Sequence, residues 1–179
     1  MRWLLWLISG VVLGGLVHLG TVLALPRIAS HNAYARIAAT TPVNTVVPLP
    51  SALPGSAVVP FMDPAFATAV CRYDLSKGTL KLTAPVSPAY TSVSFYTPLG
   101  VAYYAINDRA AGRRVIELDL MTTPQRNELP ENEEVTAADR LIVESPTVTG
   151  LIVLRAFAPE IGLMPAVGTA LGAAQCRAQ

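Results

Sequence analysis

Two carboxylates stand two residues apart in the segment "VIELDLM", residues 115–121. Glu117 and Asp119 would share one face of a strand there, because successive side chains of a strand alternate between its faces. On a strand this offset spans about 7 Å, a separation at which paired carboxylates do acid–base work on glycosides. A carboxylate-dependent hydrolase is therefore one candidate function, whereas alternating acids on a solvent-exposed face give the same pattern without activity.

A second candidate site is a polar turn that follows an aromatic segment. Asn107, Asp108 and Arg109 come directly after "VAYYAI", residues 101–106, which contains Tyr104. An acid, an amide and a guanidinium beside aromatic rings can hold a small polar ligand, which makes a ligand carrier the second alternative. The same residue types also form Asx-type turns with a surface ion pair, a purely structural role.

Arg155 is unusual because it interrupts the apolar segment "GLIVLRAF", residues 150–157. A cation in an apolar strand needs a partner, and we expect a structural pair with Glu144 or Asp74.

Composition excludes several other chemistries. The two histidines, His18 and His31, precede the β-rich part of the chain, so Ser-His-Asp, Cys-His and histidine–metal catalysis have no base or ligand there. Neither of the common glycine-rich nucleotide-binding motifs is present. A net charge of +1, with 14% charged residues, gives no basic face for nucleic acid. We expect no cofactor, no metal and no nucleic-acid partner.

The chain has two cysteines, Cys71 and Cys176, and no Cys-x-x-Cys motif. They are either two free buried thiols or one disulfide, and the disulfide is favoured because the count is even and an export segment is present. The bond would close a loop of about a hundred residues, which the chain-entropy model values at roughly 4–5 kcal/mol. A disulfide implies an oxidising compartment.

The elements that must position these residues are strands. Period-two alternation and turn residues about every ten positions predict about seven strands and an antiparallel, β-sandwich-like domain. Besides the strand that holds Cys71, the predicted strands are 79–83, 92–96, 101–106, 115–121, 140–144 and 150–157. Residues 161–174, which are apolar and rich in small side chains, predict a short helix near the C-terminus.

Residues 3–25 form an uncharged apolar run of twenty-three residues. As a helix this run is about 34 Å long, enough to cross a bilayer, and it is longer than the apolar region of a cleaved signal peptide. We therefore expect an uncleaved membrane anchor at residues 1–25 and a β-domain at residues 61–179. Between them, residues 26–60 would be a juxtamembrane and proline-rich linker, with five prolines in residues 42–60. The prolines fit either a spacer or an irregular edge packed on the domain.

Gly10, Gly14 and His18 are spaced four residues apart in the apolar run and fall on one side of a helix. Such a stripe lets two membrane helices approach closely, although glycine is also common in membrane helices that have no partner. The flanking charges barely decide orientation by the positive-inside rule. The expected disulfide decides it: the N-terminus is cytoplasmic, the chain crosses the membrane once and the domain lies outside.

Residues 63–114, "DPAFATAVCRYDLSKGTLKLTAPVSPAYTSVSFYTPLGVAYYAINDRAAGRR", resemble the family called domain of unknown function 1254. Asp74-Leu75-Ser76, Gly78, Pro85 and the Asn107–Arg109 turn fit its layout, and "RLIVESPTVTGLIVLRAF" (140–157) resembles its later strand pair. The resemblance implies a β-sandwich-like fold and, in bacteria, frequent pairing with domain of unknown function 1214. It implies no reaction. We therefore expect a bacterial inner-membrane protein that crosses the membrane once and carries a periplasmic domain. The domain would be a binding or assembly module whose partner is a separate 1214-domain protein or a second copy of this chain.

Overall fold

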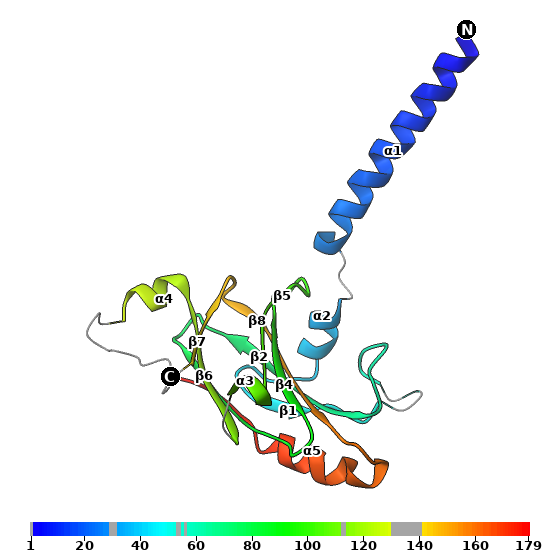
Figure 1. Cartoon of the computed structure of the whole chain (residues 1–179). Coiled ribbons are helices and arrows are strands. Elements are labelled where there is room, and N and C mark those ends of the chain that lie inside the picture. Colours follow the sequence, from blue (N-terminus) through cyan, green and yellow to red (C-terminus); the bar gives the residue numbers. More distant parts are fainter. Residues whose placement is uncertain (1, 29–31, 53–54, 56, 112–113, 130–140) are drawn as a thin grey trace. The chain divides into compact units, whose positions relative to one another are not determined.

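The computed structural model describes residues 2–28, 32–52, 55, 57–111, 114–129 and 141–179 (Figure 1). The chain forms two compact units, residues 1–32 and residues 33–179. The first unit contains helix α1 (Arg2–Ile28), and the second contains the remaining elements.

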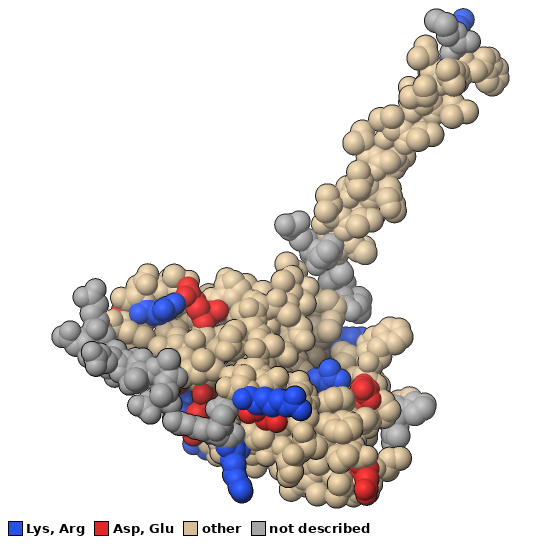
Figure 2. Space-filling model, in the orientation of Figure 1, with Lys and Arg blue, Asp and Glu red and all other residues tan. Residues whose placement is uncertain are grey.

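Helix α1 is long and apolar enough from Arg2 to Leu25 to cross a membrane, and within the described residues no other helix meets that test. Between Trp3 and Leu25, α1 contains no charged residue, and this stretch is tan on its visible side (Figure 2). By length and composition alone, the helix suits either a membrane anchor or a signal sequence.

The second unit is mainly β, as the alternating pattern predicts, and its strands form two sheets. The first sheet has the order β1-β2-β8-β4-β5, and every neighbouring pair is antiparallel. Its strands are β1 (Val46–Pro48), β2 (Phe66–Asp74), β8 (Thr149–Phe157), β4 (Thr91–Tyr96) and β5 (Ala102–Asn107).

The second sheet has the order β7-β6-β3-β9. Its strands are β7 (Leu141–Ser145), β6 (Val115–Thr122), β3 (Leu80–Pro85) and β9 (Gln175–Ala178). β6 and β7 run parallel, contrary to the antiparallel expectation for every pair. Eighteen residues separate these two strands, which is long enough for the crossover that a parallel pair requires. The helix α4 (Thr123–Asn127) begins this connection, whereas residues 130–140, most of the acidic segment, lie outside the described residues.

The two sheets pack through the faces that the sequence alternation predicts. In β3, Leu80 and Leu82 are fully buried while Lys81 is exposed, so the strand presents one apolar face to the core. The core-facing residues of the other long strands are Ala69, Cys71 and Tyr73; Val93 and Phe95; Ile116, Leu118 and Leu120; and Ile152, Leu154 and Ala156.

Two helical segments flank the sheets. The predicted C-terminal helix is present as a 3-10 turn at Ile161–Leu163 followed by α5 (Met164–Gly172), which packs against β1, β2 and β8. Helix α2 (Ala33–Ala38) covers part of the outer face of the first sheet, where its Ile37 is buried against Val70 and Leu151.

The compact unit begins at Ala33, earlier than the expected boundary at residue 61. β1 lies inside the proline-rich segment and pairs with β2, and Val43 forms a further bridge to Arg72. Of the two interpretations of this segment, the packed edge therefore holds for its described residues and the free spacer is wrong. Its prolines fit an edge position, because an edge strand tolerates a missing backbone donor.

Candidate functional site

The polar turn after β5 serves the backbone around it. The Asn107 Oδ1 accepts a hydrogen bond from the Ala110 amide at 3.0 Å and so begins the short helix α3 (Asp108–Ala111). The Asp108 Oδ1 accepts one from the Thr91 amide at 3.4 Å. The first contact caps a helix and the second joins the turn to β4, so both serve the local structure.

Tyr104 does not join this turn. Its ring faces the core, with its centroid 5.8 Å from that of Phe95, whereas the Arg109 side chain is exposed. The Tyr104 ring therefore packs on the core while Arg109 lies at the surface, and ligand binding at this turn stays a prediction.

Glu117 and Asp119 do share the outer face of β6, as predicted, but their surroundings differ. Glu117 is exposed, whereas the Asp119 side chain is only 1% exposed. The expectation of a common solvent-exposed face is therefore wrong for Asp119. Met121, next along the same face, is also buried, and α4 packs against β6 at this end of the strand.

Arg155 meets an aromatic ring rather than either expected acid. Its guanidinium carbon lies 4.6 Å from the centroid of the Phe66 ring, a cation–π contact. Glu144 instead pairs with Arg126, with Oε2 2.9 Å from Nη1, and Asp74 accepts a hydrogen bond from the Ser76 amide. The expected ion pair is wrong because Glu144 belongs to the second sheet, whereas Arg155 lies in the first. Asp74 lies at the other end of the β2–β8 pair, opposite Thr149, while Arg155 lies opposite Thr68.

The expected disulfide is present between Cys71 and Cys176, whose Cα atoms are 6.5 Å apart. Cys71 belongs to β2 in the first sheet and Cys176 to β9 in the second, so the bond ties the two layers together through the core. Disulfides are typical of oxidising compartments.

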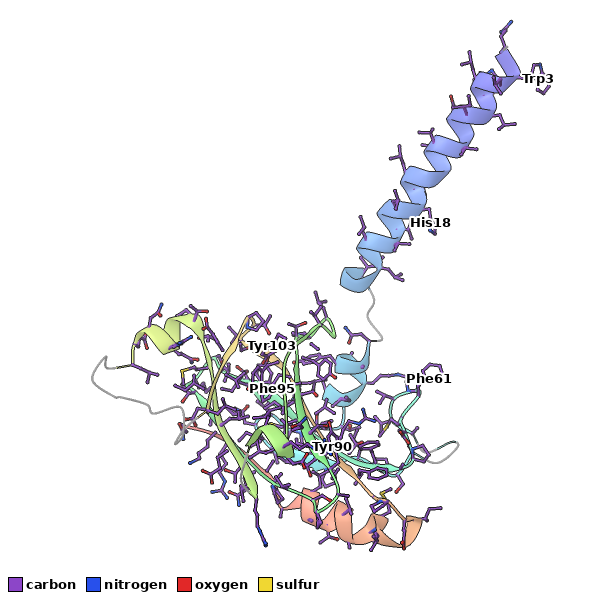
Figure 3. The ribbon with its side chains drawn as sticks, viewed as in Figure 1. Trp3, His18, Phe61, Tyr90, Phe95 and Tyr103 are labelled. Atoms are coloured by element: carbon purple, nitrogen blue, oxygen red, sulfur yellow. A yellow bond between two sulfur atoms is a disulfide. The ribbon has the colours of Figure 1, made fainter. Side chains whose placement is uncertain are left out.

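A chain of hydroxyl groups also joins the sheets, and the sequence analysis did not find it. Tyr103 donates to the Tyr73 hydroxyl at 3.1 Å, Tyr73 contacts the Ser145 hydroxyl at 3.0 Å, and Ser145 donates to the Thr147 carbonyl at 2.6 Å. Figure 3 shows Tyr103 close to the core residue Phe95. The one sequence sign was the hydroxyl-rich turn "SPTVT", residues 145–149.

This hydroxyl chain satisfies polar groups that the packed sheets would otherwise bury without partners. Burial raises the pKa of the Tyr103 phenol well above its ordinary value, although the bond to Ser145 acts in the opposite direction. Tyr103 therefore keeps its proton and donates it in the hydrogen bond to Tyr73.

The remaining candidate site is the free side of β5. Among the described strands β5 pairs with β4 alone, so its other side presents main-chain donors and acceptors along six residues. The segment Ala102–Asn107 contains no charged residue and no proline, and its exposed positions, Ala102 and Ala105, are small. Sheet edges are commonly protected by charges or proline, and this edge carries neither.

These features define a class: a two-layer β-domain, cross-linked through its core, that follows a helix suited to a membrane. Residues 43–174 match the family model described as "Protein of unknown function (DUF1254)", and the chain belongs to that family. No curated protein matches the chain.

Two solved structures resemble the fold. The VPA0106 protein from Vibrio parahaemolyticus aligns with a TM-score of 0.60 and 11% identity over 87% of this chain. A putative uncharacterized protein from Burkholderia cenocepacia aligns with a TM-score of 0.47 and 15% identity over 76% of this chain. The aligned part is 34% of each neighbour, so this chain spans about a third of their length. At 11% identity the first likeness shows the fold alone.

Proposed function

We propose that this protein is a single-pass membrane protein of the bacterial cell envelope whose β-domain is a binding module for a partner protein. In this proposal α1 stays attached as the anchor, and the domain lies in the periplasm. The cross-layer disulfide supports an oxidising location for the domain, because such bonds rarely persist in the cytoplasm.

The observation that carries the binding role is the uncharged free side of β5. An extended segment of a partner can add a strand to such an edge, with main-chain hydrogen bonds supplying affinity and side-chain pockets supplying specificity. Small side chains at Ala102 and Ala105 leave room beside the ladder for the added strand. The partner is a separate protein, with a 1214-domain protein as the first candidate, or a second copy.

The fold of the longer Vibrio protein is compatible with this role. About a third of that protein aligns with this chain, so the same fold exists there as one part of a larger protein. A β-domain used in this way needs surfaces that bind other chain segments, and an open sheet edge is such a surface.

Site-specific photocrosslinking in native membranes tests the proposal. We would place a photoreactive residue at Ala105 on the β5 edge and, as a matched control, at Ala89, an exposed alanine in the β3–β4 connection. We expect a discrete cross-linked product from position 105 alone, and its mass separates a second copy from a different protein. Identical products from both positions would contradict the proposal.

A charge on the edge supplies a second test. With the photoreactive residue at position 102, Ala105→Lys should abolish cross-linking, because a lysine on an edge opposes the addition of another strand. Ala89→Lys should leave cross-linking unchanged. Cross-linking that persists in Ala105→Lys would mean that the partner binds elsewhere.

A further inference from the structure

Three large apolar side chains stand exposed around helix α2. Phe61 is fully exposed, at 103% of its reference area, and Leu99 and Val101 in the β4–β5 turn are 51% and 60% exposed. We call these three residues together with the exposed side of α2 the α2 face. Single exposed apolar residues are ordinary, but a group of them marks an interaction surface.

Packing under α2 places these side chains on its two sides. Ile37 of α2 belongs to a cluster that includes Val59, two residues before Phe61, and Tyr96, three residues before Leu99. The β4–β5 turn lies beside α2 in Figure 1, and Figure 3 shows Phe61 pointing away from the rest of the unit on the other side of that helix. The cluster around Ile37 therefore links the two segments that carry these side chains.

Phe61 also adopts a backbone conformation that its side chain disfavours. Its φ is 61°, in the left-handed region where a bulky residue is a genuine outlier. Its ring has no share in the core, so packing within the described part of the unit gives no reason for phenylalanine at this position. An aromatic ring held outward in this way suits a contact outside the chain.

The α2 face is almost uncharged. Arg36, exposed on α2, is the one charged residue in residues 32–62, and the exposed Asp63 follows Phe61 by two residues. The β4–β5 turn, residues 97–101, is uncharged, and the surface over it is tan in Figure 2. A mainly apolar face with a cation on its helix matches the interfacial layer of a bilayer.

Chain connectivity selects this face rather than another. Four residues separate Ile28, the end of α1, from Ala33, the start of α2. Such a connection reaches at most about 18 Å, and the headgroup region of a bilayer is itself several ångströms thick on each side. If α1 crosses the membrane, α2 therefore lies close to the lipid headgroups.

We propose that the α2 face rests on the bilayer, with Phe61, Leu99 and Val101 inserted among the lipid headgroups. This inference rests on the membrane anchor of the proposed function. The domain then lies against the membrane as a second attachment, in the way that amphipathic surfaces bind at the interface. Aromatic residues such as Phe61 are common on the apolar side of such surfaces.

The test uses the full chain reconstituted into vesicles of phosphatidylethanolamine and phosphatidylglycerol. Single variants Phe61→Cys and Leu99→Cys would carry an environment-sensitive fluorophore, since the native cysteines are buried and bonded to each other. Lys81→Cys is the matched control: Lys81 is exposed on the outer face of the second sheet, whereas α2 covers part of the outer face of the first. We expect a blue shift and quenching by nitroxide lipids at positions 61 and 99, and neither at 81.

Other outcomes separate the competing explanations. A label at Val12→Cys in α1 reports the anchor itself, and no quenching there would mean that the anchor of the proposed function is wrong. Quenching at position 12 without quenching at 61 and 99 would overturn the lipid contact and leave the anchor intact. A blue shift at 61 and 99 without lipid quenching would assign the α2 face to a protein contact and would also overturn the inference.

Discussion

Tyr73 on β2 lies directly opposite Gly150 on β8, and the Tyr73 hydroxyl occupies the space that a Cβ at position 150 would fill. The Tyr96 carbonyl approaches the same space. Glycine is required here by close packing rather than by an unusual backbone angle. The missing side chain at position 150 lets the hydroxyl chain through Tyr73, Ser145 and Tyr103 pass between the sheets.

Gly150→Ala should therefore destabilise the domain by about 2 kcal/mol or more, since a methyl group would overpack the site and displace hydrogen-bonded groups. Urea unfolding followed by tyrosine fluorescence or circular dichroism measures this change. Tyr73→Phe alone should cost about 1–2 kcal/mol. In the Tyr73→Phe background, Gly150→Ala should cost less than in the native protein, because one of the three clashing atoms, the hydroxyl oxygen, is gone while the ring carbon and the Tyr96 carbonyl remain. An equal cost in both backgrounds would contradict this account.

Acid should weaken the link between α4 and β7. The Thr123 hydroxyl, foremost, and Arg126 lower the pKa of Glu144 below its ordinary value. A carboxyl whose pKa is lower in the folded state stabilises the fold above its unfolded-state pKa, near 4, and loses this effect as the pH falls through its folded-state pKa. Unfolding measured from pH 6 to pH 3 should show a smaller acid loss in Glu144→Gln than in the native protein. Glu160→Gln, an exposed acid elsewhere, should keep the native acid response.

Cys71 and Cys176 should be bonded to each other in protein taken from its native membrane. Alkylation before and after reduction, read by mass spectrometry, should modify neither cysteine at first and both afterwards. Reduction should destabilise the domain by up to about 4–5 kcal/mol, because the bond closes a loop with a sequence separation of 105 residues. Two thiols alkylated without reductant would contradict the bond and weaken the periplasmic proposal.

The proposed orientation predicts which reporter works at the C-terminus. A reporter that needs the periplasm should be active when fused after Gln179, and one that needs the cytoplasm should be silent. The reverse pattern would mean that the β-domain faces the cytoplasm, where the disulfide would not be expected to persist.

Helix α1 should do more than anchor the chain. In the part of the chain that the structure describes, no atom lies near the missing side chains of Gly10 and Gly14, so a partner helix has access to them. Gly14→Leu should weaken helix association by about 1–2 kcal/mol, roughly tenfold, because it separates the two backbones. Val11→Leu, on another side of α1, is the control. Cross-linking in membranes measures the recovery of a partner or dimer. Equal recovery with both variants would mean that α1 is only an anchor.

The alternation of apolar and polar residues predicted the fold class because strands such as β3 and β6 bury one face, and neighbouring residues of a strand point to opposite faces. β1 and β9 escaped prediction because three or four residues are too short to show a period. These strands form through pairing with β2 and β3, which no local pattern reveals.

The candidate site was less predictable for a related reason. The two cysteines could be paired from their number alone. The contacts of Tyr103 and Tyr104, in contrast, depend on a register shift beside Phe95 in the β4–β5 pair. That irregularity accompanies a Tyr103 hydroxyl that reaches Tyr73 and a Tyr104 ring that packs on Phe95. Arg155 likewise could not be assigned, because its partner Phe66 is distant in sequence and is brought near by β2–β8 pairing.

The bond between Cys71 and Cys176 makes most of the β-domain a covalently closed ring attached to the rest of the chain at Cys71. A protease that cuts one peptide bond between these residues would nick the ring without releasing a fragment, and the nicked domain would stay joined to whatever anchors residues 1–70. Removal of the domain therefore needs two cuts within the ring, a cut before it, or reduction followed by proteolysis. Turnover of this protein is thus coupled to the thiol chemistry of its compartment as well as to its proteases.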